Sequence, residues 1–170
     1  MNDISDDMPP LAPTRLVAIK LDERSIPRGA SSNGQANIEH EREVAIFDIL
    51  DGNSFTVAGA DGPYALTLAV EEDRLVFHLA SETGAPIAPQ AIALPPFKRI
   101  LKDYFLVCES YYEAIRSAPP ARIQAIDVNR RDLHDEGSKL LQARLGDRIT
   151  VDFDTARRLF TLLCALQWKG

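Results

Sequence analysis

The chain has 170 residues, enough for one folded domain, and its 45% hydrophobic and 26% charged residues are typical of a globular protein. Its formal net charge of −6 argues against nucleic acid as a partner, because nucleic-acid-binding surfaces are usually basic. The acidic N-terminus and the absence of a long apolar run argue against a signal peptide or a membrane anchor, so we expect a cytoplasmic protein.

The first third of the chain contains a tail, a strand, a loop and a helix. Residues 1–13 hold three aspartates and three prolines without periodicity, which predicts a disordered tail before a single domain at residues 14–170. Apolar residues from position 14 predict a strand, and the Gly-, Ser- and Asn-rich segment 27–37 predicts a loop. Asn37 is the expected cap of a helix whose apolar stripe would be Val44, Phe47 and Leu50.

The middle of the chain alternates with the period of a strand. Two alternating runs, at residues 64–70 and 75–79, flank the polar residues 71–74 and predict an antiparallel hairpin with one buried face. Ile92 and Leu94 suggest one more strand, and Pro95-Pro96 ends it.

Helical spacing dominates the last third. A helix after Pro95-Pro96 has its stripe at Phe97, Leu101, Tyr104, Cys108, Tyr111 and Ile115. Pro119-Pro120 predicts the start of another, with Ile123, Ile126, Leu133, Leu140 and Leu141 inward. A short strand at 148–152 precedes a last helix, capped by Asp152 or Asp154, with Ala156, Leu159, Phe160, Leu163 and Leu166 inward.

Strands in the first half and helices in the second predict an α+β fold, in which a mainly antiparallel sheet packs against about four helices. Regular βαβ alternation is missing, which argues against a doubly wound nucleotide-binding fold. Cys108 and Cys164 sit in apolar helical patterns and are expected to be reduced and buried. With three scattered histidines, they show no zinc-ligand spacing, so we expect no metal and no cofactor.

One helical stripe is interrupted by residues of a different chemistry. Steps of three and four from Ile126 reach Arg130, Leu133 and Gly137, so an arginine and a glycine occupy a face expected to be buried. Glycine within a helix suggests that another backbone or a ligand approaches closely. His134 lies one turn from both Arg130 and Ser138, so these side chains share one side of the helix.

Two interpretations of this stretch remain open. Arg130, Arg131, His134 and Ser138 could form an anion pocket, with arginine binding a phosphate or carboxylate and histidine carrying a proton. Alternatively, the arginines pair with Asp127 or Asp135 and His134 is satisfied in the core. Lys98 and Arg99 stand at a helix start, where they oppose the helix dipole and either pair with nearby carboxylates or add to the anion site.

Two further features bear on function. The aromatic residues Phe105 and Tyr112 flank the inner stripe of their helix, which favours a second buried interface or a dimer contact. The chain contains no G-x-S-x-G, no phosphate-binding glycine loop, no H-E-x-x-H and no closely spaced cysteine pair, so no catalytic residue is assigned.

Four segments of the chain carry a resemblance to a known family, and they are Glu41–Asp48, Lys102–Phe105, Cys108–Arg116 and Asp152–Phe160. In these segments the chain resembles an uncharacterised protein family of alphaproteobacteria, number 0262. The resemblance implies a bacterial cytoplasmic protein and carries no activity with it. Three hypotheses follow: a small regulatory or adaptor protein that binds another protein or itself, an anion-binding protein or phosphate-ester enzyme using Arg130, Arg131 and His134, and an RNA-binding or RNA-cleaving protein.

Overall fold

The computed structural model describes residues 13–27 and 36–168, and the predicted tail and the 27–37 loop lie almost wholly outside them. A four-stranded sheet contains β1 (Leu16–Leu21), β3 (Tyr64–Glu71), β4 (Arg74–Ser81) and β5 (Pro86–Ala93), in the order β1-β3-β4-β5. A second, two-stranded sheet pairs β2 (Phe55–Val57) with β6 (Ile149–Val151). The helices are α2 (Ala36–Asp51), α3 (Lys98–Ser117), α4 (Pro120–Leu145) and α5 (Phe153–Gln167), and a 3₁₀ turn, η1 (Pro95–Phe97), leads into α3. The predicted α+β class is confirmed.

The predicted hairpin is the centre of the larger sheet. β3 and β4 pair antiparallel over their full length, from Tyr64 opposite Ser81 to Glu71 opposite Arg74. Glu72 and Asp73 form the turn, and both have positive φ, as the tight hairpin turns matched to strand twist require. β4 pairs antiparallel with β5, which begins six residues before the predicted strand.

β1 pairs parallel with β3, so the sheet is mixed at this edge. Parallel neighbours cannot be joined by a tight turn and need a long crossover, which here contains α2. The alternation at residues 16–21 predicted the strand but carried no information about its direction, because the pairing residues are about 48 positions apart in the chain.

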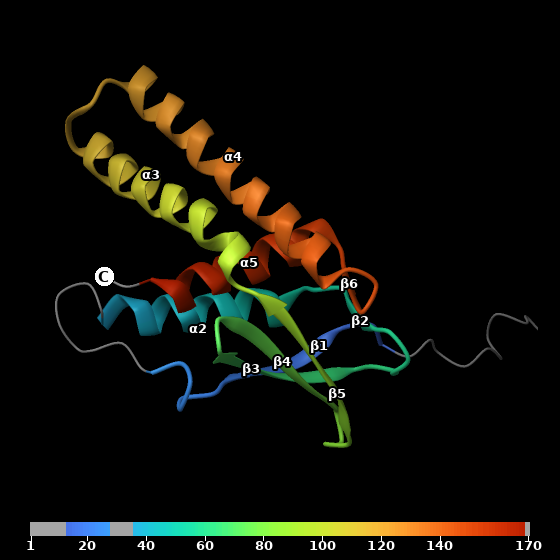
Figure 1. Ribbon diagram of the computed structural model, residues 1–170. Coiled ribbons are helices and arrows are strands. Elements are labelled where there is room, and N and C mark those ends of the chain that lie inside the picture. The colour runs from blue at the N-terminus through green and yellow to red at the C-terminus, as the bar shows by residue number, and fades with distance from the viewer. Residues whose placement is uncertain (1–12, 28–35, 169–170) are drawn as a thin grey trace, which may run out of the picture.

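Figure 1 shows the sheet on one side of the molecule, α2 and α5 beside each other above it, and α3 and α4 as a helical hairpin that extends outward. α5 contacts α2 on one side and α4 on the other, and its side chains are buried almost all round, as expected of a central helix. The Asp152 cap is confirmed, since its carboxylate accepts a hydrogen bond from Thr155 N–H at 2.9 Å. The helix start at Pro120 is also confirmed.

The predicted stripe of α2 is wrong at two of its three positions, while the third, Leu50, is partly buried against the core. Val44 and Phe47 are 44% and 67% exposed, and the face that packs on α5 carries Ile38, Arg42, Ala45 and Ile49 instead. The cause is the close packing of α2 on α5, where a small alanine fits and Arg42 hydrogen-bonds to the Ala165 carbonyl oxygen at 3.3 Å. The helix begins at Ala36, so Asn37 stands inside its first turn and not before it as expected.

Candidate functional site

The Arg130–Ser138 stretch lies on α4 where this helix crosses α5. Gly137 is buried against Phe160, and a Cβ atom at Gly137 would stand about 2.2 Å from the Phe160 ring. The interruption of the stripe at this position is therefore explained by close packing against the side chain of a core aromatic, and not by the backbone or the ligand that was expected there. Ser138 is fully buried, and its hydroxyl donates to the His134 carbonyl oxygen at 2.7 Å.

Both arginines of the stretch pair with the same aspartate. Arg130 Nη2 lies 2.6 Å from Asp127 Oδ1, and Arg131 Nη2 lies 2.7 Å from Asp127 Oδ2. The hydrogen bonds and positive charge of the arginines, chiefly Arg130, lower the pKa of the Asp127 carboxyl. The guanidinium of Arg130 also lies over the Tyr111 ring, 5.2 Å from its centroid, which holds α4 against α3.

His134 is held as a neutral imidazole. Its Nε2 lies 2.8 Å from Thr161 Oγ1, and that hydroxyl donates to the Arg157 carbonyl oxygen, so it accepts from Nε2–H. Nδ1 is buried and has no hydrogen-bond partner among the described residues. Burial, followed by the charge of Arg157, lowers the pKa of His134 to about 4.

This pKa predicts a pH dependence of stability. Because the folded pKa of His134 is below the unfolded value of about 6.5, its stabilising contribution is complete above pH ~6.5 and is lost as pH falls toward 4. Allowing for partial solvent exposure, unfolding at pH 5 should be easier than at pH 7 by about 1 kcal/mol from this group. His134→Gln keeps a donor for Thr161 and should remove that part of the slope in denaturant titrations; an unchanged slope would contradict the assignment.

The thiols nearby are poor nucleophiles. Burial is the main cause that raises the pKa of Cys108, which is half-buried, and of Cys164, which is buried. Burial also raises the pKa of the Tyr104 hydroxyl between them. All three groups are protonated at neutral pH, and a protonated thiol is a weak nucleophile and metal ligand. The described residues contain no group of three or more His, Cys, Asp or Glu that could hold a metal ion.

The two groups of basic residues in the anion hypothesis, Lys98 with Arg99 and the Arg130 cluster, are not brought together. Lys98 pairs with Asp73 at 3.6 Å and Arg99 is exposed, both at the start of α3. Arg130 contacts Tyr111, which is thirteen residues further along α3, or about 20 Å at 1.5 Å per residue. An anion site at the Arg130 cluster stays a prediction. It depends on basic groups that converge on one pocket, and Lys98 and Arg99 do not converge with Arg130.

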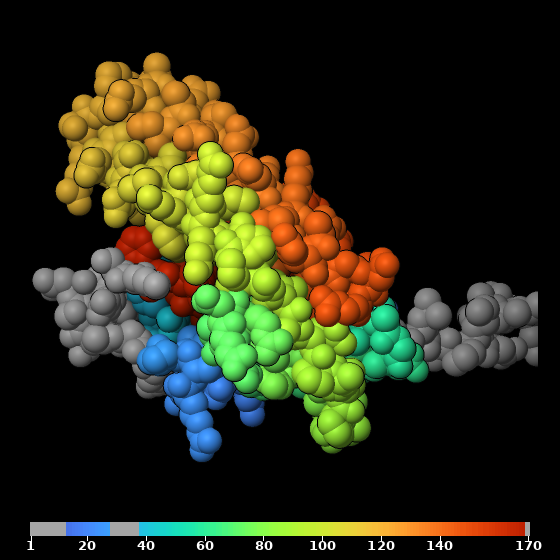
Figure 2. Space-filling model, in the orientation of Figure 1, coloured from blue at the N-terminus to red at the C-terminus, as the bar shows by residue number. Residues whose placement is uncertain are grey.

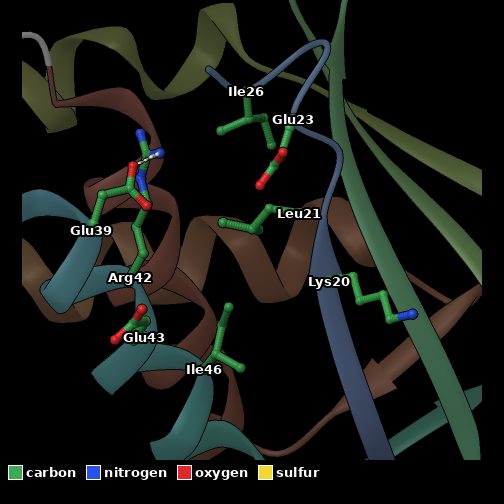
Figure 3. A pocket seen from close by; sticks show the side chains of 8 residues that line it. All are labelled: Lys20, Leu21, Glu23, Ile26, Glu39, Arg42, Glu43 and Ile46. Atoms are coloured by element: carbon green, nitrogen blue, oxygen red, sulfur yellow. Dashed lines mark hydrogen bonds and ion pairs between the residues drawn. The ribbon is translucent and has the colours of Figure 1, made fainter. Parts of the chain in front are cut away.

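A cavity of about 340 Å³ lies elsewhere, between α2 on one side and the end of β1 with the segment that follows it on the other (Figure 3). None of the six predicted site residues lines it. Among the residues that the structure describes, the cavity is lined by apolar side chains and by charged ones. The apolar ones are Leu21, Ile26 and Ile46, and the charged ones are Lys20, Glu23, Glu39, Arg42 and Glu43. These eight residues include no serine, threonine, cysteine or histidine that could act as a nucleophile or proton carrier near neutral pH.

Arg42 is the buried charged residue among the residues that line this cavity, and the sequence reasoning missed it. Its side chain is 8% exposed and its Nη1 donates to the Pro27 carbonyl oxygen at 3.1 Å and to Glu39 at 3.3 Å. With the bond from Nε to Ala165, it joins α2, the end of α5 and the chain after β1. The available signal was its place at helical spacing between Ile38 and Ala45, which put a guanidinium on the buried face.

No helix of the described part of the chain is long and apolar enough to span a bilayer.

No solved structure shows a significant match. Three bacterial relatives are similar over nearly their whole length. The chain is 53% identical over 158 residues to a Brucella canis protein, covering 92% of this chain and 95% of the relative. It is 52% identical over 161 residues to one from Azorhizobium caulinodans, covering 93% and 96%. It is 48% identical over 168 residues to one from Rhodopseudomonas palustris, covering 98% and 100%. The family model of the uncharacterised protein family UPF0262 matches residues 13–169, and the chain belongs to that family.

Proposed function

We propose that the chain is a small regulatory or adaptor protein that binds another protein through the outer half of the α3–α4 hairpin. The observation that carries this proposal is an apolar stripe on α3 that is buried at its inner end and exposed at its outer end. Leu101, Phe105, Cys108, Tyr112 and Ile115 follow one another along α3 in steps of four and three residues, so they share one side of the helix.

The inner half of the stripe is covered by the body of the molecule. Leu101 is buried, and the Phe105 ring packs edge-to-face on Trp168 with centroids 5.0 Å apart. The outer half is uncovered, with Tyr112 and Ile115 exposed by 61% and 50%. Figure 2 shows the ends of α3 and α4 as a lobe that stands clear of the sheet. Folding alone does not require apolar side chains there, whereas a partner surface does.

Affinity purification from the native cells tests the proposal, with Tyr112→Ser/Ile115→Ser as the variant and Leu106→Ser as its control. Leu106 is 53% exposed on the opposite side of α3, so its substitution removes exposed apolar area from the same helix without touching the stripe. We expect the double variant to retain the fold, since surface substitutions change stability by about 0.5 kcal/mol or less, and to lower partner recovery by about tenfold or more.

Sedimentation of the purified chain decides whether that partner is a second copy. A dimer that the double variant dissociates would identify the hairpin as a self-association surface. Equal losses in the double variant and in Leu106→Ser, or unchanged recovery in both, would contradict the proposal.

A further inference from the structure

The outward side of α2 presents the stripe that its sequence would place in a core. Val44 and Phe47 are one turn apart and exposed by 44% and 67%, which makes Phe47 the most exposed large apolar side chain among the described residues. An exposed phenylalanine on a well-packed helix is not explained by folding, because the opposite side of α2 already packs on α5.

This apolar pair lies within a set of carboxylates. Going round the helix at 100° per residue places Glu41 and Asp48 on one side of Val44 and Glu43 beyond Phe47, while Asp51 lies one turn further on. These four carboxylates form no ion pair or hydrogen bond within residues 13–27 and 36–168. Carboxylates elsewhere on the surface do find partners, as Asp73 does with Lys98 and Asp135 with Arg157 at 3.4 Å.

The acidic residues at the end of α2 also act against the helix. The last turn of α2 has no basic residue, and negative charge at a helix C-terminus is unfavourable. The exposed carbonyl oxygens there are capped from outside, since Arg158 Nη1 donates to the Asp48 carbonyl oxygen at 3.0 Å and also to that of Gly52. Asp48 and Asp51 are therefore not needed for helix formation, and their charge is available to a partner.

We propose that the acidic face of α2, made of Glu41, Glu43, Val44, Phe47, Asp48 and Asp51, binds a basic amphipathic segment of a partner protein. The unpaired carboxylates select lysine and arginine, and the same charge repels nucleic acid and anionic lipid. Phe47 at the centre selects a segment that also carries an apolar side chain, because exposed aromatics are the usual anchors of protein interfaces. The proposal is argued from residues of α2 alone and does not rest on the α3–α4 hairpin.

The first test uses a synthetic helical peptide of about 18 residues with leucine and lysine at helical spacing, long enough to form a stable helix. Its control is a peptide of equal charge with serine in place of leucine. We expect the leucine peptide to bind more tightly and Phe47→Ser to weaken its binding by about tenfold or more. Asp48→Asn/Asp51→Asn should weaken it several-fold, and Asp132→Asn/Glu136→Gln, two exposed carboxylates of α4, should not.

Equal binding of the two peptides, binding unchanged by Phe47→Ser, or an equal effect of the α4 pair would each overturn the proposal, because non-specific charge attraction would then explain the data. The second test places a photo-crosslinking residue at position 47 in the native cells and sequences the captured segment. A net basic segment with helically spaced apolar residues supports the proposal, and an acidic segment, a second copy of this chain or no capture overturns it. The same residue at position 112 reports on the hairpin separately.

Discussion

Phe160→Ala should lower the free energy of unfolding by about 3–5 kcal/mol, the range for removing a buried aromatic ring from a core. Phe160 is fully buried at the crossing of α4 and α5. Its ring meets Tyr104 at 6.2 Å and His134 at 5.1 Å between centroids, and it lies against Gly137. Denaturant titration with circular dichroism measures the loss, and Leu106→Ser, an exposed apolar control, should change stability by about 0.5 kcal/mol or less.

A second substitution at the same contact, Gly137→Ala, should destabilise the wild-type chain but stabilise the Phe160→Ala variant. In the wild-type chain, Gly137→Ala places a Cβ atom against the Phe160 ring and should cost about 1–3 kcal/mol through overpacking. In the Phe160→Ala background the ring is gone, so the same change should stabilise by up to about 1 kcal/mol through helix propensity. The same sign in both backgrounds would show that Gly137 is not held by this contact.

Removing the ring should also change His134, since the two rings pack at an interplanar angle of 83°. Water entering beside the imidazole relieves the desolvation that lowers its pKa, so the pKa should rise from about 4 toward the ordinary value of about 6.5. An NMR titration of the His134 imidazole carbons measures the change, and the same titration of the wild-type chain is its control. A pKa that stays near 4 would place the cause outside this contact.

Elements with local signals could be predicted from the sequence. The β3–β4 hairpin, the break at Pro119-Pro120 and the Asp152 cap each depend on residues a few positions apart, and each stands where expected. The parallel edge strand β1 and the short pair of β2 with β6 depend on residues far apart in the chain, for which a single sequence holds no pairing information.

The α2 helix shows where hydrophobicity is an insufficient guide. Two stripes share helical spacing, and the one at Val44 and Phe47, which contains no charged residue, faces outward. The buried stripe includes Arg42, whose burial is compensated by two carbonyl oxygens that come from distant parts of the chain. A rule that buries the larger side chains therefore selects the wrong face.

The candidate site could be predicted in part. The interruption at Gly137 indicated a close approach on α4, but the expected neighbour was a backbone or a ligand, and the observed one is the Phe160 side chain, which a single sequence does not reveal. The pairing of both arginines with Asp127 follows from three- and four-residue spacing and was one of the two interpretations. The low pKa of His134 depends on α5 residues 23 and more positions away.

Arg42→Met should lower the free energy of unfolding by about 2–3 kcal/mol, the value of hydrogen bonds made by a charged group. Methionine keeps much of the volume of the side chain but leaves the carbonyl oxygens of Ala165 and Pro27 without this donor. Loss of the guanidinium also removes a positive charge from the C-terminal end of α5, where it complements the helix dipole. Denaturant titration measures the change, and Arg122→Met, at an exposed position of α4, is the matched control.

The outcome separates two accounts of a buried charge. If the cost of desolvating the guanidinium cancels its three hydrogen bonds, Arg42→Met will be as stable as the wild type, as happens when some buried ion pairs are replaced by apolar residues. We expect the loss instead, because two of the three acceptors are backbone carbonyls that remain in place after the substitution. Hydrogen exchange locates the effect: faster exchange at the end of α5 and around Ile26, with β3 and β4 unchanged, would show that Arg42 ties these segments together at the cavity wall.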